Sequence, residues 1–156
     1  MKIDAIRQEL QHLDEVTPLE GPRYAACLQT YEAASNQREL ILDWFSTRMI
    51  PQLSGERATF LSIGCGAGEL DVEILAAATA QTSSIAYVGL EPDPLQCEAF
   101  LSRMARESND DIEVQAHNSG FEQFTGEQRF DLVLMVHSLY YMDNPAQMLD
   151  AALNLV

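Results

Sequence analysis

The spacing of the hydrophobic residues changes near residue 58. Over residues 1–57 they recur every three or four positions, which is the spacing of amphipathic helices. Prolines and a glycine interrupt this spacing at residues 17–22, and Asn36 stands where it can cap a further helix that ends before Pro51. We therefore expect residues 1–57 to form a helical cover packed on the rest of the chain. The alternative is a cover that also forms one wall of a substrate pocket.

From residue 58 to residue 156, short apolar runs alternate with helical spacing. Four runs predict strands: ATFLSI (58–63), SIAYVGLE (84–91), DIEVQA (111–116) and RFDLVLMV (129–136). Helices are expected over residues 69–80 and 93–106 and after Asn144, with a loop or short helix over 121–127. This alternation predicts an α/β fold with a mostly parallel sheet, and the nearly continuous apolar runs indicate helices on both faces of that sheet.

The chain is strongly acidic. It has 9 Lys and Arg against 24 Asp and Glu, which gives a formal net charge of −15. From Ala58 onward, 15 acidic residues stand against three arginines. Nucleic acids and anionic membranes both require clustered basic residues, so we expect neither as a partner. The charge favours solubility or a cationic ligand.

The cysteine spacing and the hydropathy of the chain indicate in which cellular compartment the protein is expected. Cys27, Cys65 and Cys97 lack the spacing of a zinc site or of a disulfide framework, so we expect reduced thiols, no metal and a cytoplasmic protein. No apolar run reaches the roughly 18 residues that a membrane span needs, and the N-terminus does not have the pattern of a signal peptide. A length of 156 residues suits one structural unit.

The strongest chemical signal is LSIGCGAGE at residues 61–69, where a predicted strand runs through glycines into a helix. Gly64 permits a tight turn, Gly66 lets a ligand approach the backbone, and Gly68 lets the helix pack closely. Glu69 stands where a GxGxxG motif needs its third glycine, and its carboxylate would face a pyrophosphate. The turn therefore argues against a dinucleotide. The alternative is a glycine-rich connector that holds no ligand.

A second signal is Glu91, which ends the second predicted strand, 23 residues after Gly68. In such folds an acid at this place accepts hydrogen bonds from ribose hydroxyls, although it can also be an ordinary acid at a strand end. Together with the glycine turn, Glu91 indicates a ligand of the adenosine type. The sequence has no Walker lysine, which excludes a P-loop.

Three segments, LSIGCGAGELDVEIL, VGLEPDPLQ and FDLVLMVHSLYYMDNPAQML, resemble the class I S-adenosylmethionine-dependent methyltransferases. Over residues 36–156 the chain is most similar to the histamine N-methyltransferase type, through the serine before the first glycine, Gln96 after the Glu-Pro, and the paired Tyr140 and Tyr141. The resemblance implies a Rossmann-like fold with a strand order beginning 3-2-1-4 and S-adenosylmethionine as the cofactor. It also implies methyl transfer to a small molecule at nitrogen.

The resemblance further implies which residues bind the cofactor. The glycine turn would hold the methionine part, Glu91 and Gln96 the ribose, and the loop after the third strand the adenine, with Val136 beside the methyl group. This set is Gly64, Cys65, Gly66, Gly68, Glu91, Gln96, Ser119 and Val136. The alternatives are an exposed helix residue for Gln96 and a simple turn residue for Ser119.

His137 and Tyr140 are the candidate catalytic residues, again by resemblance. His137 follows the fourth predicted strand and would act as a general base or line the pocket. Tyr140 and Tyr141 would form either a packed pair or an aromatic wall for a substrate amine or the sulfonium.

Two features depart from the family pattern. Arg38 stands about where the histamine enzymes have a glutamate that binds the substrate amine, so histamine itself is not expected as the substrate. The family fold has seven strands, and about four are predicted here. The fourth strand would then lie at the sheet edge, which favours self-association or pairing with the remainder of a longer parent protein.

The sequence therefore predicts the cofactor-binding half of a methyltransferase, an enzyme type whose fragment can be inactive by itself. Direct SN2 transfer of a methyl group needs alignment and a dry pocket rather than a nucleophilic residue. The runner-up is a non-catalytic S-adenosylmethionine-binding or regulatory module. A nucleotide-dependent oxidoreductase is disfavoured by Glu69.

Overall fold

The computed structural model describes residues 21–126 and 128–156, so the helical spacing before residue 21 lies outside the described part. The chain divides into two compact units, Met1–Gln37 and Arg38–Val156. In the first unit, α2 (Gly21–Ala34) begins inside the segment that the prolines and the glycine mark as a break. Proline is compatible with the first turn of a helix, where its missing N–H has no acceptor to lose. The division expected at residue 57 stays a prediction.

Four parallel strands form the centre of the second unit: β1 (Arg57–Ile63), β2 (Ser84–Leu90), β3 (Ile112–His117) and β4 (Leu132–Leu134). Their order is β3-β2-β1-β4, which confirms the order implied by the resemblance. In the register, Phe60 of β1 lies opposite Tyr87 of β2 and Leu132 of β4. The direction of winding reverses at β1. The carboxyl end of β1 is therefore the switch point at which open α/β sheets bind ligands.

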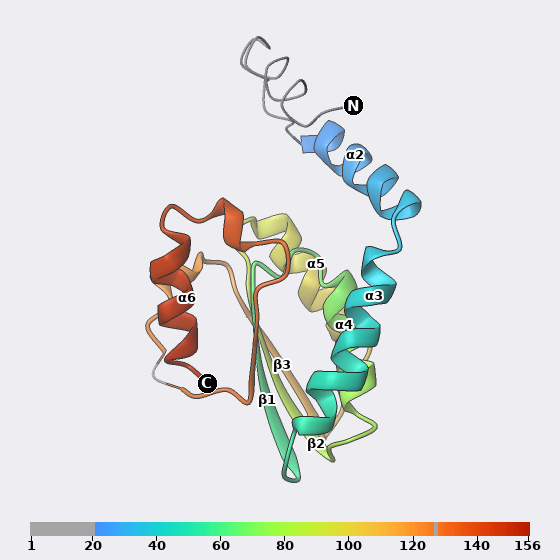
Figure 1. The fold of residues 1–156 in the computed structure, drawn as a ribbon, viewed down its shortest axis with the longest axis vertical. Coiled ribbons are helices and arrows are strands. Elements are labelled where there is room, and N and C mark those ends of the chain that lie inside the picture. The colour runs from blue at the N-terminus through green and yellow to red at the C-terminus, as the bar shows by residue number, and fades with distance from the viewer. Residues whose placement is uncertain (1–20, 127) are drawn as a thin grey trace, which may run out of the picture. The chain divides into compact units, whose positions relative to one another are not determined.

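Helices cover both faces of this sheet, as predicted (Figure 1). On one face lie α3 (Gln37–Trp44), α4 (Glu69–Ala78) and α5 (Pro94–Met104), and on the other lies α6 (Pro145–Leu153). Alternate residues of β1, β2 and β4 contribute to two separate cores, one on each face of the sheet, whereas β3 contributes to the first core only. Phe60 and Tyr87 stack at 5.4 Å between ring centroids in the first core, and Leu61 and Ile63 pack with Met148 of α6 in the second. No helix among the described residues is both long and apolar enough to cross a membrane.

The segment after α3 packs on the first core. A π-helical turn, η1 (Phe45–Met49), leads into a 3-10 turn, η2 (Ile50–Gln52), and Phe45 and Ile50 are buried. Pro51 thus lies inside a helical turn, whereas the sequence predicts that the helix ends before it. It occupies the first turn of η2, where a proline costs no hydrogen bond.

Side chains cap the starts of two helices in the second unit. Asp93 accepts hydrogen bonds from the backbone N–H groups of Leu95 and Gln96, at 2.8 and 3.3 Å, and so fixes the start of α5. Asn144 accepts from the N–H of Gln147 at 3.2 Å and fixes the start of α6. Both helices begin at the carboxyl edge of the sheet because of these caps.

The fourth strand is shorter than residues 129–136, the range that its apolar run predicts. Asp131 explains the late start, because its carboxylate accepts hydrogen bonds from both the backbone N–H and the hydroxyl of Thr59, each at 2.8 Å. The Asp131 side chain thus takes a backbone N–H of β1 that would otherwise be free to pair with the backbone of a neighbouring strand. At the other end, His137 has a φ of +57°, which lies outside the strand region.

Candidate functional site

The glycine turn follows β1 at the switch point of the sheet. Gly64, Gly66 and Gly68 have φ angles of +69°, +55° and +75°, a backbone region that favours glycine. The N–H groups of Gly64 and Cys65 both donate to the carbonyl of Leu90, at 2.8 and 3.1 Å. These bonds hold the turn against the end of β2, which carries the acidic residue of the site.

The surroundings of the three glycines differ. A Cβ atom at Gly64 would lie 2.5 Å from the Cβ of Ser138, and one at Gly68 would lie 2.8 Å from the ring of Phe100. A Cβ at Gly66 would meet nothing within 4 Å. Gly64 and Gly68 therefore serve the packing of the turn, while Gly66 faces open space that a ligand can occupy.

Glu91 is bound to this turn. Its Oε2 accepts a hydrogen bond from the N–H of Gly66 at 3.0 Å, and its Oε1 accepts one from the N–H of Asp93 at 2.9 Å. The two bonds fix the orientation of a half-buried carboxylate beside the open space at Gly66. Each oxygen keeps a further lone pair, so Glu91 can still accept two ligand hydroxyl groups.

Gln96 and Ser119 lie on the segments that follow β2 and β3. Gln96 is exposed in the first turn of α5, and Ser119 is half-buried in the loop after β3. Asn118, which belongs to no sequence motif, joins these segments by donating to the carbonyls of Glu91 and Pro92, at 3.0 and 2.9 Å. An asparagine directly after a strand is a common turn residue, so its sequence position gave no specific signal.

The segment after β4 places the other predicted residues. Val136 packs against the first core, and His137 is exposed and is the one non-glycine residue with positive φ in the described part of the chain. Tyr140 and Tyr141, on the 3-10 turn η4 (Leu139–Tyr141), are 65% and 66% exposed, with ring centroids 4.6 Å apart. The imidazole of His137 lies 6.5 Å from the ring of Tyr140. These side chains can form an aromatic surface beside the switch point.

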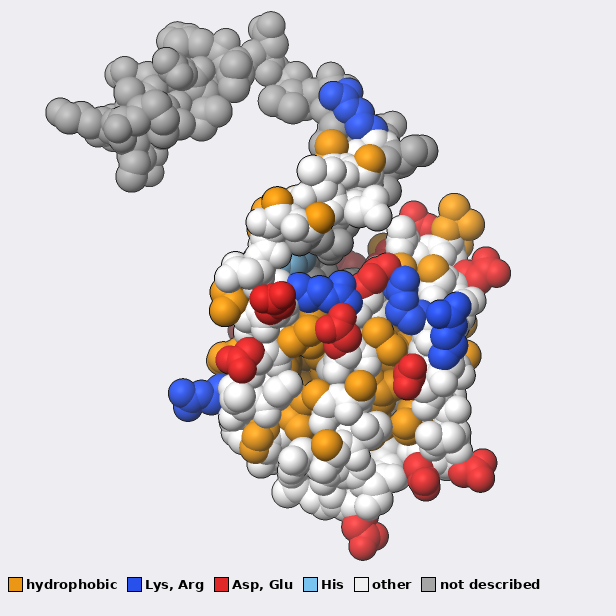
Figure 2. All heavy atoms as spheres, turned by 90° about the vertical axis from the view of Figure 1, so that its right-hand side faces the viewer, with side chains coloured by type: hydrophobic (Ala, Val, Ile, Leu, Met, Phe, Trp, Pro, Cys, Tyr) orange, Lys and Arg blue, Asp and Glu red, His pale blue; other side chains and the backbone are white. Residues whose placement is uncertain are grey.

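Two arginines hold the end of the glycine turn from the helical face. Arg103 of α5 donates to the carbonyl of Ala67 and lies 2.8 Å from Oε1 of Glu69. Arg38 of α3 donates to the carbonyl of Glu69 and pairs with Glu73. Figure 2 shows basic and acidic side chains side by side on this face, with hydrophobic side chains below them. The carboxylate of Glu69 is thus engaged by an arginine rather than directed to a ligand.

A buried polar pair lies beneath the turn. The hydroxyl of Tyr87 donates to Oδ1 of Asp71, in the first turn of α4, at 2.9 Å. Burial raises the pKa of the Asp71 carboxyl above its ordinary range, and hydrogen bonds from Ser62 and Tyr87 oppose that shift. Burial, followed by the charges of Asp71 and Glu91, also raises the pKa of the Cys65 thiol. Cys65 is buried in the first core, and the direction of its pKa shift is opposite to that of an activated cysteine nucleophile.

The sequence matches a family model and a curated protein. Residues 61–156 match a model described as a methyltransferase domain. Histamine N-methyltransferase of Cavia porcellus is 28% identical over 108 residues, which cover 62% of this chain and 37% of that protein.

Solved structures show the same fold at low identity. The plantazolicin methyltransferase BpumL, solved in complex with a desmethylPZN analog and SAH, has a TM-score of 0.60 at 16% identity, and covers 86% of this chain and 49% of its own. A putative S-adenosylmethionine-dependent methyltransferase from Methanococcus maripaludis has a TM-score of 0.58 at 14% identity, with 92% of this chain and 61% of its own covered. The chain thus spans about half the length of BpumL and less of the histamine enzyme.

Proposed function

The chain belongs to the methyltransferase domain family, with a class I fold, and on that premise we propose that it binds S-adenosylmethionine and transfers the methyl group to a nitrogen atom of a small molecule. The observation that carries the proposal is the hydrogen bond between Gly66 and Glu91 beside open space at the switch point. This arrangement offers a fixed carboxylate for hydroxyl groups next to a backbone that a ligand can approach. The residues present fit the cofactor.

The proposed binding residues surround that space. The turn from Gly64 to Gly68 holds the methionine part, with Gly66 as the point of closest approach. Glu91 accepts hydrogen bonds from the ribose hydroxyls through its remaining lone pairs, and Gln96 in the first turn of α5 is the second proposed ribose residue. Ser119 and Val136 flank the adenine and the methyl group. The acidic chain suits a cofactor whose sulfonium is cationic.

Bound S-adenosylmethionine supplies an electrophilic methyl group on a sulfonium sulfur. The nitrogen lone pair of the acceptor forms the new bond to carbon as the carbon–sulfur bond breaks, and sulfur keeps the electron pair. The protein holds the acceptor in line and keeps water out. His137 is the proposed acceptor of the proton that the nitrogen then loses, and Tyr140 with Tyr141 forms the proposed wall for the acceptor.

Arg38 bears on the identity of the acceptor. In the histamine enzymes a glutamate that binds the substrate amine stands about where this chain has Arg38. The guanidinium of Arg38 instead donates to Glu73 and to the carbonyl of Glu69. We therefore propose a small-molecule acceptor other than histamine. The expected cytoplasmic location also stays part of this proposal.

Isothermal titration of the whole chain with S-adenosylmethionine, S-adenosylhomocysteine and NAD tests the cofactor. The proposal is supported if S-adenosylmethionine and S-adenosylhomocysteine bind and NAD does not. It is overturned if NAD binds more tightly than either of them. Transfer of labelled methyl from S-adenosylmethionine to a panel of small amines tests the activity. Hydroxyl and thiol acceptors in the same panel test whether nitrogen is the atom methylated.

A second candidate is a non-catalytic S-adenosylmethionine-binding or regulatory module. The observation that favours it is the position of β4, which is one of the two edge strands among the described residues and pairs with β1 over three residues only. The side of the site beyond β4 then has no wall from the described strands. Cofactor binding without methyl transfer to any acceptor of the panel would support this candidate.

A further inference from the structure

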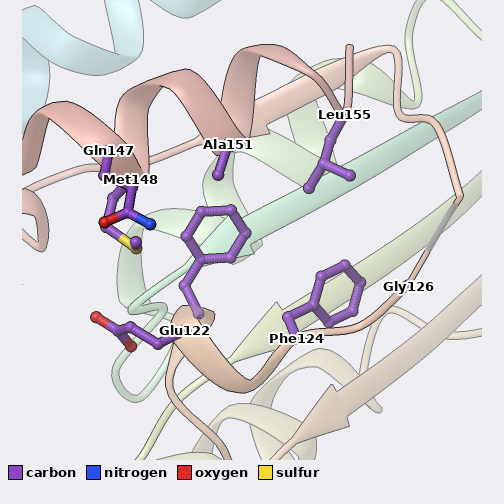
Figure 3. A pocket seen from close by; sticks show the side chains of 8 residues that line it. Glu122, Phe124, Gly126, Gln147, Met148, Ala151 and Leu155 are labelled. Carbon is purple, nitrogen blue, oxygen red and sulfur yellow. The ribbon is translucent and has the colours of Figure 1, made fainter.

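A pocket of about 240 Å³ lies between α6 and the segment that follows β3, away from the glycine turn (Figure 3). Its apolar walls come from Phe121 and Phe124 on one side and from Met148, Ala151 and Leu155 on the other. None of the predicted cofactor residues lines it. The pocket is therefore separate from the site proposed for S-adenosylmethionine.

The pocket exists because the link from β3 to β4 is poor in helix. Among the described residues, the link contains one 3-10 turn, η3 (Phe121–Gln123), beside α6. The rings of Phe121 and Phe124 fill part of the space, with centroids 6.5 Å apart and planes at 28°. A Cβ at Gly126 would lie 2.6 Å from the ring of Phe124, so the glycine leaves room for the tip of this ring beside the backbone.

The polar groups are concentrated at one end. In Figure 3, Glu122, Gln147 and Met148 lie at one end of the pocket, and Phe124 and Leu155 lie toward the other. The Glu122 carboxylate forms no hydrogen bond or ion pair within the described part of the chain, and no basic side chain lines the pocket. Since the chain also carries a net charge of −15, this end favours a positive group.

The volume sets the size of the apolar part. A dry apolar cavity of about 150 Å³ takes up benzene, so a pocket of about 240 Å³ can hold a larger flat ring system. Aromatic rings and a methionine sulfur are favourable neighbours for such a ring. We propose that this pocket binds a small arylalkylamine, with the ring between Phe121 and α6 and the ammonium group beside Glu122.

Two probes of one shape and opposite charge test the proposal: tryptamine and indole-3-propionate. Titration of the whole chain, labelled at the methionine methyl groups, is followed by NMR. We expect tryptamine to shift the Met148 signal and leave Met104, which is buried in the other core, unchanged. Indole-3-propionate should bind more weakly. Equal binding of both probes, no binding of either, or shifts that spare Met148 would each overturn the proposal.

Two variants locate the ligand. Ala151→Phe fills the pocket and should lower tryptamine affinity by about tenfold or more, whereas Ala146→Phe, at an exposed position of the same helix, should leave it unchanged. Glu122→Gln should lower it about two- to fivefold, the range of an exposed ion pair, and the loss should shrink as salt is added. Wild-type affinity in Ala151→Phe would overturn the location. The Met148 shift of the unsubstituted protein decides the case if that variant fails to fold.

Discussion

The hydroxyl of Ser138 donates a hydrogen bond of 2.6 Å to the carbonyl of Ile63, and this buried bond joins the segment after β4 to the end of β1. The same serine lies against Gly64, where a side chain on residue 64 would collide with it. One residue thus fixes both the start of the glycine turn and the segment that carries His137.

Replacing Ser138 by alanine should therefore destabilise the fold. The carbonyl of Ile63 would lose a buried partner, a loss of about 1–3 kcal/mol in the free energy of unfolding. Urea denaturation measures this change. In the control, Ser108→Ala removes a hydroxyl that donates to the carbonyl of Met104 at 3.2 Å in a more exposed place, and it should change stability by less than about 0.5 kcal/mol. Equal effects in the two variants would contradict the role assigned to Ser138.

Gly66→Ala should abolish or strongly weaken the binding of S-adenosylmethionine. The added Cβ enters the open space, and the positive φ adds backbone strain of about 1–2 kcal/mol. Gly55→Ala is a matched control, because Gly55 also has a positive φ and lies in an exposed loop. Calorimetry should show lost affinity for Gly66→Ala and wild-type affinity for Gly55→Ala. If both variants bind normally, the turn has a structural role only.

Glu91→Ala should weaken cofactor binding by about 1–3 kcal/mol, because hydroxyl groups of the ligand and the N–H of Gly66 lose their acceptor. Glu91→Gln should weaken it less, since one amide oxygen remains. Glu98→Ala removes an exposed acid from α5 and serves as the control for charge. Unchanged affinity in Glu91→Ala, measured by calorimetry, would remove this residue from the site.

Asp71 should make stability depend on pH. Its pKa is raised in the folded state, so the folded protein binds more protons than the unfolded chain above the ordinary value of 3.8. The contribution of Asp71 to the free energy of unfolding therefore falls as pH rises from about 3.8 to the raised pKa, and it is constant above that pKa. Asp71→Asn removes this dependence, and its oxygen can still accept the bond from Tyr87. Urea denaturation at pH 4 to 8 should show that the free energy of unfolding of the variant increases relative to that of the wild type as pH rises. Parallel dependence on pH in the two proteins would contradict the prediction.

The edge of β4 should mediate self-association at high protein concentration. Its residues are apolar, whereas the opposite edge strand, β3, exposes Glu113, Gln115 and His117. Val133→Lys should reduce the association seen by sedimentation velocity, while Gln115→Lys adds the same charge at the other edge and should not. A monomer at every concentration, with β4 amides as protected from hydrogen exchange as those of β1, would show that the edge is already covered.

The elements that local patterns define could be predicted from the sequence. The four strands, the helix start near residue 93, the cap at Asn144 and the strand order follow from apolar runs, capping residues and resemblance to a family. The glycine turn and Glu91 were found for the same reason, since their spacing is a local signal. The structure brings these two together, as the sequence implied.

The remaining features depend on contacts between distant segments. Ser138 and Asn118 carry no motif, and their importance appears only when the ends of neighbouring strands meet. Arg103 reaches Ala67 across 36 positions, so its spacing gives no sign of the contact. The late start of β4 depends on a contact between Asp131 and a side chain of another strand, Thr59. The pocket beside α6 lies where a link that is poor in helix leaves space uncovered, and no residue pattern in the sequence indicates such a space.

The edge position of β4 has a thermodynamic consequence. The segment that follows this strand, residues 136–138, also borders the glycine turn, so a strand that pairs with β4 and a ligand that binds the turn would both order the same backbone. If strand pairing and ligand binding stabilise the same arrangement of that segment, the two binding processes are coupled. Each must then raise the affinity of the other by the same factor. Occupancy of the site would then report on the state of an edge that the ligand does not touch.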